Sequence, residues 1–131
     1  MQNYKKVIAA VFVAHDGKIL VAQRAKKDSL YGKWEFPGGK LEDGETEIEC
    51  LQREMREEFN INIQVGDYIT SSFFEHRQLP YEMRAYWVHS FTGELQLIEH
   101  HAIAWVLPSE LSNYDMPDPD KPIIQKLLDT L

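Results

Sequence analysis

Apolar residues recur at the period of a helix near the middle of the chain: Ile48, Leu51, Met55 and Phe59. This spacing predicts one apolar stripe that faces the core. Thr46 and Glu49 form the T-x-x-E pattern of a capping box, so the helix is expected to begin at Thr46. Asn60 follows the last apolar position, where a left-handed residue is favoured, and should end the helix.

The remaining apolar runs are shorter and rich in β-branched residues, which predicts strands. The expected strands cover residues 7–13, 18–22, 34–36, 61–74, 81–91, 95–98 and 103–107. A turn at Asp16-Gly17 joins the first two, so they are predicted to pair as a hairpin. A second apolar stripe in residues 122–131 predicts a C-terminal helix, with Pro122 in its first turn. These elements predict a mixed α and β protein with a single domain, residues 1–131.

Three glutamates share a second face of the central helix, which is predicted to point away from the apolar stripe: Glu54, Glu57 and Glu58. One interpretation is a solvated acidic face that neighbouring arginines balance. The alternative is a site for a hard divalent cation, because such ions prefer several carboxylate and carbonyl oxygens. The glycine-rich loop at Gly38 and Gly39, shortly before the helix, can supply carbonyl oxygens to the same ion.

The chain from Gly39 to Ile61 resembles the Nudix box, G-x5-E-x7-R-E-U-x-E-E-x-G-U, in which U is apolar. The matching residues are Gly39, Glu45, Arg53, Glu54, Met55, Glu57, Glu58 and Ile61. Asn60 stands where the family has Gly, and Asn tolerates the same left-handed backbone. The preceding WEFPGGK, residues 34–40, resembles the lead-in of the MutT-type branch, which cleaves nucleoside triphosphates.

This resemblance implies an α+β fold, the layered Nudix α/β/α sandwich with a mixed sheet. It also implies a Mg²⁺ or Mn²⁺ ion held by Gly38, Glu54, Glu57 and Glu58. Arg53 is expected to organise the glutamates. The general base is expected to be Glu54, with Glu99 as the alternative. The substrate contacts implied in the same way are Arg24, Phe36, Gly38, Gly39, Lys40 and Asp120.

Asp120 falls at the position where the resemblance places a base-reading side chain. MutT enzymes that prefer oxidised dGTP carry Asn there. An ionised Asp only accepts hydrogen bonds, which favours the exocyclic amino group of cytosine. An oxidised guanine, whose N7 carries a proton, remains an alternative. Asp120 is equally suited to capping the helix that Pro122 begins.

The expected activity is therefore Mg²⁺-dependent hydrolysis of a nucleoside triphosphate to the monophosphate and pyrophosphate. CTP, dCTP or 5-methyl-dCTP is the favoured substrate, and 8-oxo-dGTP is the alternative. Two other functions stay open: a nucleotide-binding sensor without turnover, and a Nudix hydrolase for another diphosphate such as ADP-ribose. The sensor is disfavoured because the box has lost no acidic position.

Several candidate contacts also have a simple surface interpretation. Arg24 and Glu99 suit exposed loops as well as a substrate or metal site. His76 and Arg77 are expected at the polar tip of a hairpin, where solvated residues are the rule. Zinc binding by His100 and its neighbours is disfavoured, because adjacent strand residues point to opposite faces.

Composition narrows the partners and the compartment. The formal net charge of −7 argues against a nucleic-acid polymer as partner. A triphosphate substrate would therefore need metal ions and local basic groups. Cys50 is the only cysteine, which favours a reducing compartment, and it is predicted to lie off the apolar stripe. No apolar run approaches the length of about 18 residues of a membrane span. A cytoplasmic monomer or homodimer without a membrane partner is expected.

Overall fold

The computed structural model describes residues 3–131. A four-stranded sheet has the order β4-β1-β6-β5. Its strands are β1 (Lys5–Phe12), β4 (Gly38–Lys40), β5 (Asn62–His76) and β6 (Leu79–Thr92). β1 runs parallel to β6, and the other neighbours are antiparallel, so the sheet is mixed as predicted.

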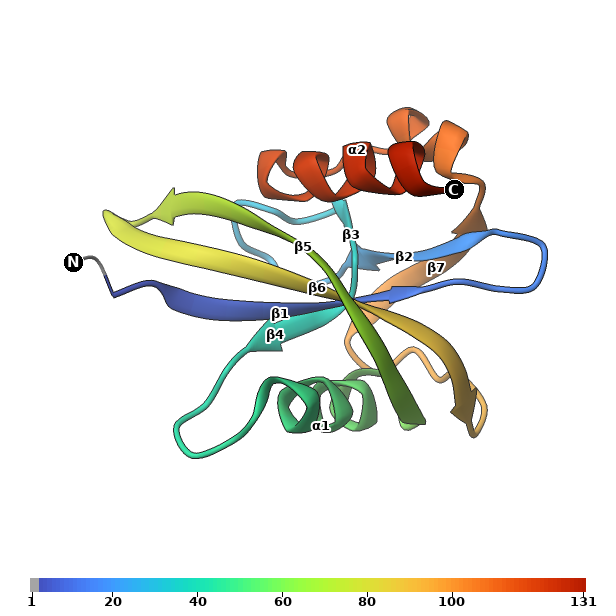
Figure 1. Ribbon diagram of the computed structural model, residues 1–131, viewed down its shortest axis with the longest axis horizontal. Coiled ribbons are helices and arrows are strands. Elements are labelled where there is room, and N and C mark those ends of the chain that lie inside the picture. Colours follow the sequence, from blue (N-terminus) through green and yellow to red (C-terminus); the bar gives the residue numbers. More distant parts are fainter. Residues whose placement is uncertain (1–2) are drawn as a thin grey trace.

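A second, antiparallel sheet has the order β3-β2-β7. It comprises β2 (Ile19–Arg24), β3 (Trp34–Glu35) and β7 (His100–Val106). The two α-helices, α1 (Glu47–Phe59) and α2 (Lys121–Thr130), lie on opposite sides of the strands (Figure 1). Two short 3-10 helices, Pro108–Asn113 and Asp118–Asp120, precede α2. This layered arrangement confirms the predicted fold class.

The ends of α1 are those that the sequence predicts. The Thr46 hydroxyl accepts from the Glu49 N–H at 3.1 Å, and the Glu49 carboxylate accepts from the Thr46 N–H at 2.8 Å. Asn60 adopts the left-handed conformation, with φ 56° and ψ 42°. Both ends of the helix are therefore defined by local chemistry.

The apolar stripe of α1 is only partly as predicted. Leu51, Met55 and Phe59 are fully buried, but Ile48, in the first turn, is 47% exposed. Cys50, predicted to lie off the stripe, is instead fully buried in the core. The reason is that β4 covers that side of the helix, with the Cys50 thiol 3.6 Å from the Lys40 carbonyl oxygen.

Two strand predictions are wrong because of long-range pairing. β2 does not form a hairpin with β1, whose two edges are already paired with β4 and β6. The first two runs are joined instead by an isolated bridge between Val13 and Ile19 and by the Ala14 N–H, which donates to the Lys18 carbonyl at 2.9 Å. Residues 95–98 form a loop, because the N–H groups of Gln96 and Ile98 donate to the Phe59 and Glu58 carbonyls at the end of α1. This loop leads directly to Glu99.

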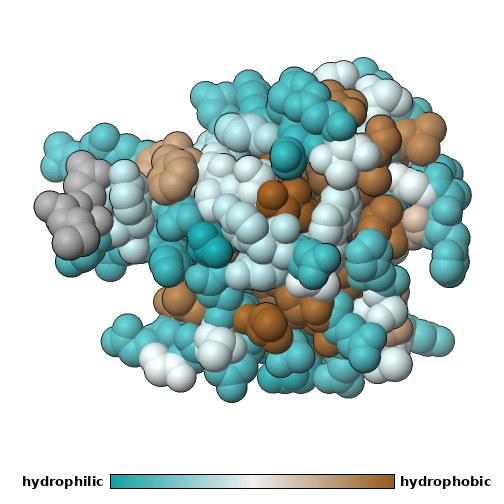
Figure 2. Space-filling model, viewed as in Figure 1, coloured by the Kyte–Doolittle hydropathy of each residue, from teal (hydrophilic) through white to brown (hydrophobic). Residues whose placement is uncertain are grey.

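The core lies in two clusters, one beneath α1 and one beneath α2. On the face shown in Figure 2, polar residues dominate and apolar residues reach the surface in separate small patches. Among residues 3–131, no helix is long and apolar enough to cross a membrane. The polar residues that line the cleft described next are carried by both sheets and by α1.

Candidate active site

Two adjoining hollows meet where β4 passes the end of β2. The inner hollow, of about 520 Å³, contains Glu58, Glu99 and His100. The outer hollow, of about 710 Å³, contains Phe36 and Asp120. The residues that line both are Arg24, Lys26, Glu35 and Gly38. The inner and outer hollows therefore form one cleft.

The three glutamates predicted as metal ligands differ sharply in exposure. The side chain of Glu57 is 51% exposed, that of Glu54 is 14% exposed, and that of Glu58 is only 3% exposed. Glu58 thus departs from the prediction that this whole face points away from the core. Burial, together with the neighbouring carboxylates and first of all Glu54, raises the pKa of Glu58 to about 10. One Glu58 oxygen, Oε2, is buried and has no hydrogen-bond partner within residues 3–131.

Arg53 holds the acidic side chains around it in place. Its guanidinium donates to Glu45 at 2.8 and 3.1 Å, to Glu54 at 2.9 Å and to Glu57 at 3.3 Å. The hydrogen bonds from Arg53 and, next in size, from the backbone N–H of Glu42 together lower the pKa of Glu45 to about 2. The guanidinium also donates to the Lys40 carbonyl at 3.1 Å, which ties β4 to α1.

The two glycines of β4 allow close packing on both of their neighbours. A Cβ atom on Gly38 would lie 1.9 Å from the Ile8 carbonyl oxygen. A Cβ atom on Gly39 would lie 2.3 Å from the Glu54 carboxylate. A side chain at Gly38 would therefore separate β4 from β1, whereas a side chain at Gly39 would displace the Glu54 carboxylate from its present position. The Gly-Gly pair therefore brings backbone and carboxylate oxygens together.

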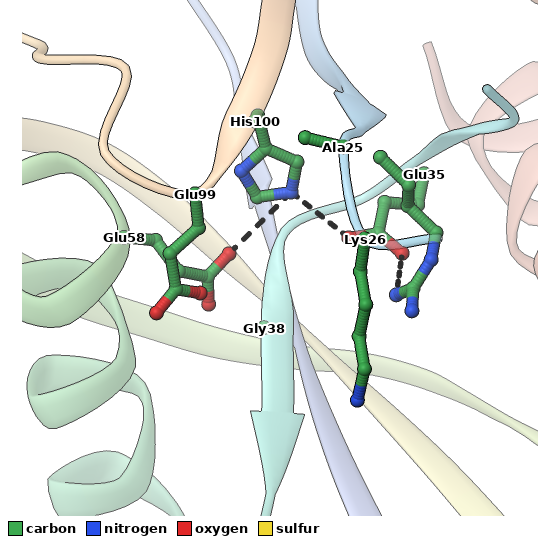
Figure 3. A pocket seen from close by; sticks show the side chains of 8 residues that line it. Ala25, Lys26, Glu35, Gly38, Glu58, Glu99 and His100 are labelled. Atoms are coloured by element: carbon green, nitrogen blue, oxygen red, sulfur yellow. Dashed lines mark hydrogen bonds and ion pairs between the residues drawn. The ribbon is translucent and has the colours of Figure 1, made fainter. Parts of the chain in front are cut away.

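His100 lies between the carboxylates of two other elements (Figure 3). Its Nε2 is 3.0 Å from Glu35 Oε2 and 3.7 Å from Glu58 Oε1. Its ring stacks on Phe59 with 5.3 Å between centroids. His100 is buried and His101 is exposed, so the two neighbours point to opposite faces of the strand, as predicted. Glu35 was not predicted as a site residue. The one feature of the sequence that pointed to it was its place in the WEFPGGK segment.

Arg24 lies at the junction of the two hollows but is not free. Its guanidinium donates to Glu35 at 3.0 Å and to Asp28 at 2.7 Å. A substrate phosphate would have to share or replace these carboxylates. Glu99 lines the inner hollow together with Glu58, and its side chain is exposed.

Phe36 and Asp120 lie in the wall of the outer hollow. Phe36 is 4% exposed and Asp120 is 2% exposed. The Asp120 side chain makes no capping bond to α2, because its helical backbone continues the preceding 3-10 helix into α2. The capping interpretation is therefore wrong. Burial raises the pKa of Asp120 well above its usual range, and the Glu35 charge acts in the same direction.

Basic side chains surround the outer hollow although the whole chain is acidic. They are Arg24, Lys26, Lys27, Lys40, His76 and Arg77. His76 and Arg77 are exposed at the tip of the β5–β6 hairpin, as predicted, and they also border the hollow. The Lys40 ammonium lies 5.9 Å from the centre of the Tyr81 ring.

Comparison with known proteins assigns the family. A model of the NUDIX domain matches residues 4–127. The chain belongs to the NUDIX family. As a Nudix hydrolase, it is 38% identical over 123 residues to the CTP pyrophosphohydrolase of Escherichia coli K12, which covers 94% of this chain and 90% of the relative.

Two further matches agree with this assignment. The 8-oxo-dGTP diphosphatase of Proteus vulgaris is 43% identical over 65 residues, which cover 48% of this Nudix chain and 58% of the relative. The solution structure of the E. coli ORF135 protein is 37% identical and has a TM-score of 0.88, over 98% of this chain and 91% of that one. The enzyme class and the MutT-like resemblance predicted from the sequence are thereby confirmed.

Proposed function

We propose that this Nudix hydrolase converts a nucleoside triphosphate to the monophosphate and pyrophosphate, with cytosine nucleotides preferred. The proposal rests on one arrangement: Glu58, on the acidic face of α1, lies at one end of a cleft whose other end holds Asp120 and Phe36. Phosphates placed at the acidic end and a base at the other would fill the cleft. The likeness to a CTP pyrophosphohydrolase supports the same substrate class.

The acidic end fits a divalent cation. Glu58 carries a buried oxygen that no group of residues 3–131 satisfies, beside the carboxylate of Glu54. Glu54, Glu57, Glu58 and the Gly38 carbonyl would hold Mg²⁺ or Mn²⁺. When bound, such an ion neutralises phosphate charge and acidifies a water molecule.

The side chains themselves position the reactants and accept a proton. Burial raises the pKa of Glu54, which brings this carboxylate closer to the pKa that suits a general base at neutral pH. Water adds through its oxygen to a phosphorus of the triphosphate, its proton passes to Glu54, and the bond to the departing phosphate oxygen breaks. Arg53 fixes Glu54 by a hydrogen bond at 2.9 Å, and Glu99 is the alternative base.

Asp120 is proposed to read the base in its neutral form. The neutral acid donates one hydrogen bond and accepts another, whereas the ionised acid expected from the sequence only accepts. The Watson–Crick edge of cytosine offers an amino donor beside a ring-nitrogen acceptor, which matches this pair. The N7–H and O6 edge of 8-oxoguanine offers a similar pair, and the Proteus relative makes 8-oxo-dGTP the second candidate.

Incubation with a panel of nucleotides in Mg²⁺, followed by separation of the products, tests the proposal. The panel contains CTP, dCTP, 5-methyl-dCTP, 8-oxo-dGTP, the four common dNTPs and ADP-ribose. We expect the highest kcat/KM with a cytosine nucleotide and formation of pyrophosphate rather than orthophosphate. The Glu58→Gln variant serves as the control and should fall by on the order of 100-fold. Cleavage of ADP-ribose alone, or tight binding without turnover, would refute the proposal.

A further inference from the structure

The inner hollow contains a second group of possible metal-binding atoms, which shares Glu58 with the predicted Nudix-box site. One oxygen of Glu35, one oxygen of Glu58 and one nitrogen of His100 lie within 4.8 Å of one another. The three residues come from β3, α1 and β7, which are far apart in the sequence (Figure 3).

The separations suit a shared ion. His100 Nε2 lies 3.0 Å from Glu35 Oε2 and 3.7 Å from Glu58 Oε1. Ligand atoms at about 2.0–2.2 Å from one metal ion are about 3 Å apart when they occupy neighbouring positions. No large rearrangement of these side chains is therefore needed.

The burial of the group gives an independent reason. Glu58 is 2% exposed and His100 is 8% exposed, and the Glu58 Oε1 atom that faces His100 is 3.7 Å from Nε2, which is longer than a hydrogen bond. A buried carboxylate that lacks full pairing is costly unless a cation or a proton compensates it. Arg24 pairs with Glu35 but lies outside hydrogen-bonding contact with Glu58.

We propose that Glu35, Glu58 and His100 bind a divalent transition-metal ion at a position distinct from that of the Nudix-box cation. Glu58 is shared, with one oxygen toward His100 and the other available to the Nudix-box ion. An imidazole nitrogen favours Mn²⁺, Co²⁺ or Zn²⁺ over Mg²⁺, which prefers oxygen ligands alone. The inference rests on the proposed function only through this shared carboxylate.

Electron spin echo spectroscopy of bound Mn²⁺ tests the site without any turnover. The protein is labelled with ¹⁵N-histidine and loaded with Mn²⁺ in an excess of Mg²⁺, without nucleotide. We expect the signal of a directly coordinated imidazole nitrogen in the wild-type protein. Oxygen ligands alone in the wild-type spectrum would overturn the proposal, whatever the outcome of the nucleotide panel.

Variants identify which histidine is the ligand. His100→Ala should remove the nitrogen signal, and His101→Ala, on the exposed face of the same strand, should keep it. Glu35→Gln should weaken Mn²⁺ binding in excess Mg²⁺ by about tenfold or more, measured by calorimetry, because one anionic ligand is lost. A nitrogen signal that survives in His100→Ala, or unchanged Mn²⁺ affinity in Glu35→Gln, would contradict the assignment. The wild-type spectrum decides the question even if His100→Ala does not fold.

Discussion

At the scale of single residues, two buried carboxyl groups define the ends of the cleft. Glu58 and Asp120 are each 2% exposed, and burial raises the pKa of both. Removal from water disfavours the charged form of a carboxyl group. Both residues therefore lower the stability of the ligand-free protein at neutral pH, which is consistent with selection for binding rather than for folding.

Glu58→Gln should stabilise the metal-free protein at pH 8 by about 1 kcal/mol or more, the scale of an unpaired buried polar group. The pKa of Glu58 is raised to about 10, so the unfolded chain binds fewer protons than the folded chain between about pH 4 and that value. Wild-type stability therefore falls as pH rises through this window. The advantage of Gln should vanish near pH 4, as measured by urea unfolding in EDTA.

Glu57→Gln is the matched control for this measurement, because the Glu57 side chain is 51% exposed. It should change stability little at either pH. An equal gain for Glu58→Gln at pH 4 and pH 8 would show that burial of its charge is not the cause.

Glu54→Gln should reduce kcat by on the order of 100-fold or more, while the affinity for Mn²⁺ falls less. Glu54 accepts from Arg53 at 2.9 Å and packs on Gly39, so the amide should keep its place. The comparison is Glu99→Gln, measured across pH. If Glu99→Gln removes the limb of kcat that rises with pH and Glu54→Gln does not, the base is Glu99.

Asp120→Asn should keep the preference between cytosine and 8-oxoguanine substrates within a few-fold, because Asn also donates one hydrogen bond and accepts another. Asp120→Leu lacks both groups and should change the ratio of kcat/KM values about tenfold or more. In the wild-type enzyme the preference should weaken as pH rises and ionises Asp120, and in Asp120→Asn it should not. A large shift in Asp120→Asn at neutral pH would instead indicate that the ionised form reads the base.

At the scale of elements, the features that the sequence predicts well are those set by neighbours in the chain. The capping box of α1 and the left-handed Asn60 depend on side chains within one turn, and both are present as predicted. The pairing of β2 could not be predicted, because it depends on β4 and β6 occupying both edges of β1. Residues 95–98 likewise form a loop instead of the predicted strand, because the N–H groups of Gln96 and Ile98 donate to carbonyls at the end of α1.

Replacement of the residue that ends α1 tests this local control. Asn60→Ala should lower the free energy of unfolding by about 1 kcal/mol, because a Cβ-bearing residue without a polar side chain is strained at φ 56°. Asn60→Gly should leave stability unchanged or raise it. Urea unfolding of the two variants checks the difference, and equal losses would mean that the Asn60 amide, not its backbone, matters.

At the scale of the whole molecule, the site is assembled by the fold rather than by one motif. The Nudix box accounts for Arg53 and the glutamates of α1, all within one helix. Glu35 and His100 are 65 residues apart in the sequence and meet only because β3 and β7 flank β2. Their hydrogen bond has no sequence signature, which is why the sequence alone could not predict the second metal position that we propose.

The distribution of charge over the molecule leads to a last prediction. The chain has a net charge of −7, yet lysines and other basic residues border the outer hollow. A polyanionic substrate must therefore be attracted locally, and salt should weaken that attraction within a Debye length of about 10 Å at 0.1 M.

KM should rise with ionic strength. Lys40→Gln should raise KM several-fold at low salt, while the difference from wild type shrinks at about 0.5 M salt, with kcat nearly unchanged. Lys126→Gln, on the exposed face of α2 and away from the cleft, should leave KM unaltered at every salt concentration. Equal effects of the two variants would show that overall charge, and not the border of the cleft, governs substrate capture.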